Sequence, residues 1–348
     1  MADVERFGVF LPSYIWEGDG PERARGIKDF ARRVEELGFD SLFITDHLLV
    51  GKRFYSVNWL EPLTTLAVAA GATERVRLGT SILIMPLRNP VILAKELATL
   101  QFLSDDRVIL GAGVGWNEAE YEAVGVKKSE RGRRTDEMLD IMMPLLEGET
   151  VTYRGQFYSV DDISIEPRSA QRPLLWIGGG SQLASPKSPD LPKFVDSVKA
   201  RTVKADGWIP RPTCPPQDIA RDWEELRTAM RAAGKDPRDT LVAHENFLHL
   251  VLTDDPAEAR RQQHEAFLKV MSAERGPEYL ESVYLFGTPD EVIASLQARV
   301  DAGVEYFFLH TMTPDPDQLQ LWVDHIIPNV TFPDTAGPVR RPPQPWQR

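Results

Sequence analysis

Short apolar runs in this sequence alternate with longer segments in which apolar residues recur every three or four positions. The clearest example is an apolar run at 76–85, followed by a helically spaced segment at 91–103 and a second apolar run at 108–110. This order of strand, helix and strand is typical of a βαβ unit in a parallel sheet.

The same alternation occurs about eight times along the chain. The expected strands are 6–11, 41–45, 76–85, 108–110, 174–177, 207–209, 241–252 and 306–309. The expected helices are 21–38, 61–73, 91–103, 131–146, 194–204, 216–233, 256–271 and 317–327, with one more that ends at 302 and is capped by Gly287-Thr288-Pro289-Asp290. This pattern predicts an α/β fold, a closed TIM (β/α)8 barrel with insertions after several strands. A doubly wound sheet is disfavoured, because the turn after the first strand, 11–14, contains no glycine fingerprint.

The alternation also defines the domain organisation. We expect a single barrel domain over residues 1–330, in which 150–167 forms a hairpin outside the main repeat. Residues 331–348 are rich in proline and are expected to form an extended C-terminal tail.

Charge and cysteine content exclude several classes of function. The 348 residues carry a formal net charge of −12, which disfavours nucleic acid and anionic membranes as partners. No apolar run is long enough to span a bilayer, and residues 1–6 lack the plan of a signal peptide, so a cytoplasmic location is expected. The one cysteine, Cys214, excludes an internal disulfide and a cysteine-cluster metal site, and its position in a proline-rich turn disfavours a nucleophilic role.

The ligand site of a barrel is built from the residues just past each strand. Asp46 and His47 stand at such a position, where His47 is either a general acid or base or a histidine that only hydrogen-bonds a loop. We expect no metal site, because the candidate ligands His47, His244, His249 and His310 are widely scattered.

Two glycine-rich segments also follow strands. Gly111-x-Gly113-x-Gly115 is a weak match to a dinucleotide fingerprint, and with Trp116 it suits a flat ring system. Gly178-Gly179-Gly180-Ser181 is expected at the start of a helix, where free N–H groups and the helix dipole would bind an anion; the alternative is a flexible turn.

A series of motifs, in order along 6–328, resembles the bacterial-luciferase-like flavin monooxygenases and deazaflavin-dependent oxidoreductases. The motifs are Asp46-His47, Leu78-Gly79-Thr80-Ser81, Arg88-Asn89-Pro90 with Ala94-Lys95, Thr99-Leu100, 111–116, Arg131-Gly132-x-x-x-Asp136-Glu137, 176–180, Asp206-Gly207-Trp208 and Gly287-Thr288-Pro289-Asp290-Glu291. The resemblance implies a barrel with a reduced flavin-type cofactor at the C-terminal ends of its strands.

The resemblance also implies roles for individual residues. Ser81-Ile82 falls where the family commonly has a non-proline cis peptide behind the isoalloxazine ring. Gly113, Gly115 and Trp116, which suit a flat ring system, are expected to bind the cofactor. His47 matches an active-site acid or base, and Asp46 a residue that contacts the ring or orients that histidine. Gly178, Gly179, Gly180 and Ser181 match the place of the cofactor phosphate. Sugar-phosphate dehydrogenases of the family carry an acidic residue in the loop that reads 113–116 here, and Glu118 lies too far along, which argues against that activity.

Two cofactors agree with the resemblance. With coenzyme F420 the protein would transfer hydride to or from a small organic substrate, and the context of Ser81-Ile82 favours this branch. With reduced FMN, supplied by a separate reductase, it would be the oxygenase of a two-component monooxygenase. A third alternative is a non-catalytic cofactor-binding or accessory subunit, against which His47 and the indoles of Trp16, Trp59 and Trp116 argue.

The resemblance further implies a homodimer. The face of Leu93, Leu97 and Leu100 could form the interface, or could pack on its own barrel. Loops 13–20, 48–60 and 273–286 are expected to line the substrate site, and their aromatic residues indicate an apolar or aromatic substrate.

Overall fold

The protein is a closed barrel of eight parallel strand positions, described here from a computed structural model. The structure describes residues 4–14, 20–49, 55–182, 193–272 and 276–333. The barrel strands are β1 (Phe7–Phe10), β2 (Ser41–Ile44), β3 (Arg77–Thr80), β5 (Val108–Gly113), β8 (Leu174–Gly178), β11 (Gly207–Ile209), β12 (Leu241–Phe247) and β13 (Tyr306–His310), with β4 (Leu83–Ile84) continuing β3 alongside β5. Pairing of β3 with β5 and of β1 with β13 closes the ring, as the sequence pattern predicts.

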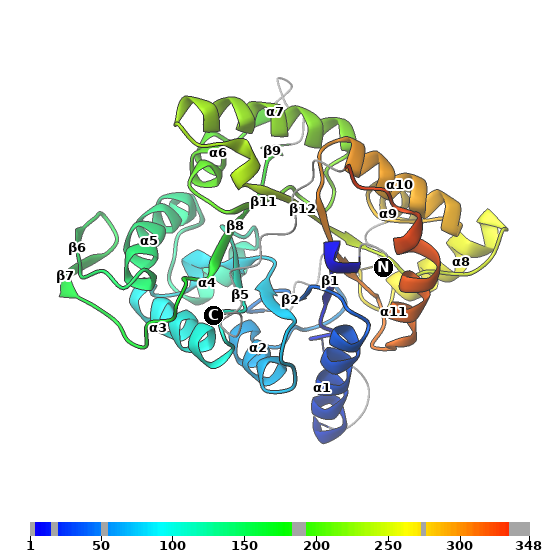
Figure 1. Cartoon of the computed structure of the whole chain (residues 1–348), viewed down its shortest axis with the longest axis horizontal. Helices are drawn as coiled ribbons and strands as arrows, with labels where there is room; N and C mark the ends of the chain where they lie inside the picture. The colour runs from blue at the N-terminus through cyan, green and yellow to red at the C-terminus, as the bar shows by residue number, and fades with distance from the viewer. Residues whose placement is uncertain (1–3, 15–19, 50–54, 183–192, 273–275, 334–348) are drawn as a thin grey trace.

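Helices surround the strands (Figure 1). They are α1 (Gly20–Glu36), α2 (Pro62–Ala70), α3 (Pro90–Leu103), α4 (Glu118–Ala123), α5 (Arg131–Leu146), α6 (Asp196–Val203), α7 (Pro216–Ala232), α8 (Pro256–Phe267), α9 (Pro277–Val283), α10 (Pro289–Asp301) and α11 (Asp317–Leu321), which continues as a π turn (Trp322–Ile326). Each of the nine helices whose ranges or ends are given above is present within a few residues of its predicted position, and α4 and α9 are additional. The helix start expected at Gly178 to Ser181 is not found there. None of the helices in the described part of the chain combines the length and apolarity that crossing a bilayer requires.

Local sequence signals explain where the helices begin. Asn89 caps α3 by accepting the N–H groups of Val91 and Ile92, and proline follows at the first helical position. Thr288 and Glu291 form a reciprocal capping box at α10, as the Gly-Thr-Pro-Asp motif predicts. These caps fix the points at which the chain leaves each loop, and therefore the shape of the loops.

Aromatic side chains fill the inside of the barrel. Phe43 and Phe308 stack at 4.3 Å between ring centroids, and Trp176 lies 5.6 Å from Phe43. Toward the N-terminal ends of the strands, Arg77 forms a buried ion pair with Asp40, which also accepts a hydrogen bond from the hydroxyl of Tyr306. The barrel is thus a packed core rather than a channel, and ligands have to bind at its other end.

Helix α3 packs on its own barrel through the face of Leu93, Leu97 and Leu100, for which the sequence left a dimer interface as one alternative. Leu93, Leu97 and Leu100 are buried there, whereas Ile92 and Leu103 are 60% and 70% exposed. Burial of the three leucines agrees with the alternative that this face packs on its own barrel, and a subunit interface on this helix stays a prediction.

Several insertions depart from the repeat. The expected hairpin forms from β6 (Val151–Arg154) and β7 (Ser159–Ile163) and projects from the helical ring at the left of Figure 1. A second pair, β9 (Ser181–Gln182) and β10 (Lys193–Phe194), follows β8. At the C-terminal end of the chain, Phe332 packs against Phe7 at 6.0 Å, so the folded part reaches this residue, and 334–348 of the expected tail lie outside the described residues.

Candidate active site

A cavity of about 520 Å³ lies where the barrel strands end, a size typical of small-molecule sites. Residues directly after β2, β3, β5, β8 and β11 line it, together with Glu245 and Phe247 near the C-terminal end of β12. Tyr55, Tyr279 and Tyr284 from the insertions add aromatic walls. Loops 48–60 and 273–286 therefore contribute to the cavity as expected, whereas Trp16 and Phe54 lie outside the described residues.

Of the predicted site residues, the cavity brings together Asp46, His47, Ser81, Ile82, Gly115, Trp116, Gly178 and Gly179. Gly113, Gly180 and Ser181 are not part of its lining.

His47 is fixed by a carboxylate that the sequence did not single out. Its Nδ1 lies 3.2 Å from Oε1 of Glu120, and that oxygen also accepts the N–H groups of Leu48 at 2.8 Å and Leu49 at 3.2 Å. The side chains of His47 and Glu120 are 6% and 1% exposed. A carboxylate on Nδ1 selects the tautomer in which Nε2 is left to exchange a proton with a ligand. The imidazole is therefore buried and oriented, an arrangement that suits a general acid or base, and this role of His47 stays a prediction.

Aromatic rings surround this imidazole. Tyr55 and Trp116 lie 5.3 and 5.5 Å from its centroid, and Trp59 lies at 6.5 Å. Trp116 lines the cavity and is 41% exposed, whereas Trp59 is buried against Tyr14 and Tyr55. Of the two indoles beside His47, Trp116 therefore lines the cavity and Trp59 supports its wall.

Asp46 does not orient His47. Its carboxylate accepts the backbone N–H of Ile84 at 2.8 Å and a bidentate pair of bonds from Arg88 at 2.5 and 3.1 Å. Burial lowers the pKa of Arg88, but the carboxylates of Asp46 and Glu61 together outweigh this effect, so the pKa is raised. The predicted orienting role of Asp46 belongs to Glu120, while contact between Asp46 and a cofactor stays a prediction.

The peptide bond between Ser81 and Ile82 is cis, as the resemblance implies. The Ile82 side chain occupies the space above two glycines, because a Cβ on Gly113 would lie 2.3 Å from Ile82 Cδ1 and one on Gly178 would lie 2.5 Å from Ile82 Cγ2. These glycines therefore admit Ile82, and Ile82 in turn presents an apolar surface to the cavity.

A second carboxylate, Glu245, lines the cavity beside this surface. It accepts the hydroxyl of Ser81 at 2.7 Å, and its other oxygen lies 3.1 Å from Nε2 of His310. The His310 ring is stacked between Phe10 at 3.4 Å and Phe247 at 4.0 Å. Burial lowers the pKa of His310 although Glu245 opposes the shift, so the neutral imidazole donates to Glu245.

The Gly178 to Ser181 segment does not start a helix, so that part of its interpretation is wrong. Ser181 begins β9, and the first helix after it among the described residues, α6, begins at Asp196. The N–H of Gly179 is bonded to Ile209 O, and the N–H and hydroxyl of Ser181 are bonded to the buried carboxylate of Asp222 at 2.8 and 2.6 Å. These groups are engaged within the protein, and binding of a cofactor phosphate by this segment remains a prediction.

Arg211 follows β11 on the cavity wall between Pro210 and Pro212. Its Nε and Nη2 are buried, and neither has a hydrogen-bond partner. Cys214, three residues later, is also buried, and burial raises the pKa of its thiol to about 12, so it is not a nucleophile.

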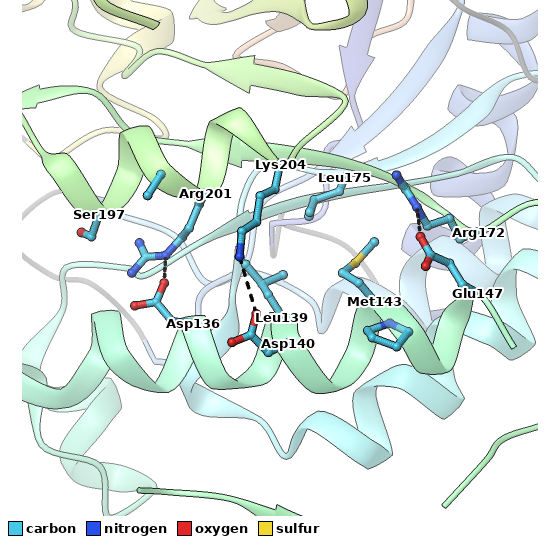
Figure 2. A pocket seen from close by; sticks show the side chains of 12 residues that line it. Asp136, Leu139, Asp140, Met143, Glu147, Arg172, Leu175, Ser197, Arg201 and Lys204 are labelled. Atoms are coloured by element: carbon cyan, nitrogen blue, oxygen red, sulfur yellow. Dashed lines mark hydrogen bonds and ion pairs between the residues drawn. The ribbon is translucent and has the colours of Figure 1, made fainter. Parts of the chain in front are cut away.

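A second cavity, of about 610 Å³, lies outside the barrel between α5 and α6 (Figure 2). Its charged side chains pair with one another, with Arg201 facing Asp136, Lys204 facing Asp140 and Arg172 facing Glu147. No charge is left there for a ligand, so the cavity at the strand ends is the candidate active site. Across the described ranges, no three His, Cys, Asp or Glu side chains converge to hold a metal ion.

The residues that line the cavity suit a flavin-type cofactor in their chemistry. Ile82 and the Gly178–Gly179 backbone contribute apolar surface, Tyr55, Trp116, Tyr279 and Tyr284 contribute aromatic rings, and Arg211 contributes a cation whose buried Nε and Nη2 have no hydrogen-bond partner among the described residues. Residues 5–306 match the luciferase-like monooxygenase family. The chain belongs to this family.

Several relatives of this chain are named F420-dependent glucose-6-phosphate dehydrogenases. The protein of Microbacterium testaceum is 29% identical over 341 residues, covering 93% of this chain and 97% of the relative. The protein of Kineococcus radiotolerans is 30% identical over 323 residues, covering 84% and 88%. A solved structure, that of an F420-dependent secondary alcohol dehydrogenase in complex with an F420-acetone adduct, supports the fold. It aligns over 94% of this chain and 99% of the dehydrogenase chain, with a TM-score of 0.75 and 21% sequence identity.

Proposed function

We propose that this luciferase-like oxidoreductase uses coenzyme F420 to transfer hydride to or from a small organic substrate. The observation that carries the proposal is the His47–Glu120 pair, a buried and oriented acid–base group inside an apolar cavity. The names of the relatives support F420 as the cofactor.

The residues of the chain divide the work. F420 supplies a deazaflavin ring that accepts or donates hydride. In the oxidising direction, the substrate carbon loses a hydride with its electron pair, and the hydroxyl proton passes to Nε2 of His47. Glu120 stabilises the imidazolium that results, because the two groups face each other away from water. Tyr55, Trp116 and Tyr284 exclude water from the cavity.

The substrate class is an alcohol or a carbonyl compound. The argument against sugar phosphates was that the loop 113–116 carries no acidic residue. Glu120, on α4, places a carboxylate beside His47 just after the end of β5. The absence of an acidic residue from loop 113–116 is therefore no longer an argument against sugar phosphates as substrates.

The test is anaerobic titration of the protein with F420 and with FMN, each oxidised and reduced, followed by fluorescence. We expect tight binding of F420, weak binding of FMN, and unchanged F420 affinity in His47→Asn. With F420 bound, a panel of secondary alcohols and sugar phosphates should be oxidised about 10²- to 10⁴-fold more slowly by His47→Asn than by wild type.

Preference for reduced FMN, with oxygen consumed, would instead make the protein the oxygenase of a two-component system with a separate reductase. Binding of either cofactor without turnover of any substrate in the panel would favour an accessory subunit.

We also propose a homodimer, now through the exposed face of α2 and α3. The groove between these helices contains Ile92 and Leu103, and Val68 of α2 is 39% exposed. Light scattering of wild type and of Ile92→Glu with Leu103→Glu measures the subunit count directly, and a monomeric wild type would overturn this part.

A further inference from the structure

Arg211 is held rigidly on the cavity wall. Pro210 and Pro212 restrict the backbone on either side of it, and the N–H of Cys214 donates to the Arg211 carbonyl at 2.8 Å to close a turn. The amide of Asn246, on β12, donates to the carbonyl of Pro212 at 3.5 Å. The guanidinium therefore extends from a fixed point.

The guanidinium has no counter-charge within the described residues. No carboxylate lies within ion-pair distance of it, and its buried Nε and Nη2 lack hydrogen-bond partners. Glu245 lines the same cavity but already accepts bonds from Ser81 and His310. Arg211 is half-buried, and leaving its two buried nitrogens without a partner is costly, which indicates that a ligand completes the site.

The other cation near this cavity is already neutralised. Arg88 forms a bidentate pair with Asp46 and lies 3.4 Å from Glu61. The backbone groups of Gly179 and Ser181 that would suit an anion are bonded to Ile209 and Asp222. Arg211 is thus the group that remains to receive a negative charge.

We propose that Arg211 anchors an oxyanion, a phosphate or carboxylate, on a molecule bound in the cavity. Around the closed barrel β11 lies four strand positions from β2 in both directions, so Arg211 and His47 stand on opposite walls. An anion on Arg211 therefore fixes one end of the ligand while the opposite wall acts on the other. The planar fork of arginine suits such a bidentate contact. This inference rests on the proposed function only for the identity of the bound molecule.

The anion has two sources, the phosphate of the cofactor or a group on the substrate. The first experiment is independent of both, because it measures binding of inorganic phosphate by calorimetry to wild type, Arg211→Met, Arg211→Lys and the control Arg238→Met. Arg238 is a suitable control because its side chain is 88% exposed and pairs with its neighbour Asp236. Far-ultraviolet circular dichroism establishes that each variant is folded.

We expect Arg211→Met to weaken phosphate binding at least tenfold, Arg211→Lys to weaken it less, and Arg238→Met to leave it unchanged. Equal phosphate affinity in wild type and Arg211→Met, or no phosphate binding by wild type, would overturn the anchor.

The second experiment identifies the source by comparing F420 with its phosphate-free deazaflavin chromophore, and FMN with riboflavin. If Arg211→Met weakens the phosphorylated member of a pair at least tenfold and spares the other, the anion belongs to the cofactor. If both members bind equally well to wild type and Arg211→Met, and phosphate binds the cofactor-loaded wild type but not the loaded variant, the anion belongs to the substrate. If wild type binds neither cofactor but phosphate binding still depends on Arg211, the proposed function fails and the anchor stands.

Discussion

Replacing Glu120 with alanine tests the centre of the proposed site. One carboxylate oxygen accepts three donors, the N–H groups of Leu48 and Leu49 and Nδ1 of His47. Leu48 and Leu49 are 52% and 40% exposed, so water replaces much of what their amides lose. The His47 side chain is 6% exposed and loses its acceptor outright. A buried donor without a partner costs about 1–3 kcal/mol, and the charge-assisted amide bonds add to this, so we expect Glu120→Ala to lower the free energy of unfolding by about 2–4 kcal/mol.

The matched control is Glu118→Ala, in the same turn of α4. Glu118 is 67% exposed and lies 3.8 Å from Lys128, so its loss should change the free energy of unfolding by less than about 0.5 kcal/mol. Urea titrations followed by circular dichroism measure both values. Glu120→Gln keeps an acceptor oxygen for the amides but removes the charge, so it should lose at least about tenfold in turnover while losing less stability than alanine. Equal stabilities of Glu120→Ala and Glu118→Ala would refute the view that Glu120 holds this site together.

Two further predictions concern packing and pH. A Cβ on Gly111 would lie 1.9 Å from the carbonyl oxygen of Thr80, so Gly111→Ala should destabilise the barrel by about 3 kcal/mol or more. The control is Gly26→Ala in α1, where the new Cβ meets nothing within 4 Å and should stabilise the protein by up to about 1 kcal/mol. Equal melting temperatures for the two variants would contradict the packing argument. Burial, against the opposing Glu245, lowers the pKa of His310, so below about pH 6.5 the unfolded chain binds more protons than the folded one and stability falls on acidification. His310→Gln should reduce the slope of unfolding free energy against pH, between about pH 7.5 and 5.5, by up to about 1.4 kcal/mol per pH unit. The control His325→Gln, at an exposed histidine, should leave the slope unchanged. The same slope in wild type and in both variants would show that His310 does not contribute to the pH dependence.

The barrel could be predicted from sequence because its strands are short apolar runs separated by amphipathic helices with strong caps. The run at 108–110, for example, is buried on both faces in β5 and carries no polar alternation. The chemistry of the strand ends follows from the same rule, which placed Asp46 and His47 at the cavity.

The partners of those residues could not be predicted in the same way, because they depend on which face of a short helix is buried. Glu118 and Glu120 are two residues apart, and only α4 itself turns Glu120 toward His47 and Glu118 toward solvent. A sequence signal was the neighbouring apolar residue Tyr121, which is buried in the structure and indicates which face of α4 is turned toward the barrel. Glu245 was hidden inside a long apolar run, where strand alternation determines that it faces the cavity.

The error at Gly178 to Ser181 has a similar origin. A glycine run after a strand is common both before helices and before extended segments, and sequence alone does not show which groups the run will bond. The deciding residue, Asp222, lies on α7, 41 positions beyond Ser181. Long-range capping of this kind leaves no local pattern.

The aromatic wall formed by Tyr279 and Tyr284 has a consequence for how such a protein could acquire new substrates. Both residues come with the short helix α9, which is secured to α8 through Glu281, bonded to His264 at 2.7 Å and to Arg260 at 3.2 Å. The His47–Glu120 pair, to which the proposed function assigns proton transfer, is by contrast encoded before residue 121. The residues proposed to contact the substrate and those proposed to transfer the proton thus lie in separate segments of the sequence. Recombination or design confined to residues 276–286 could exchange the recognition surface while the proton-transfer machinery is inherited intact.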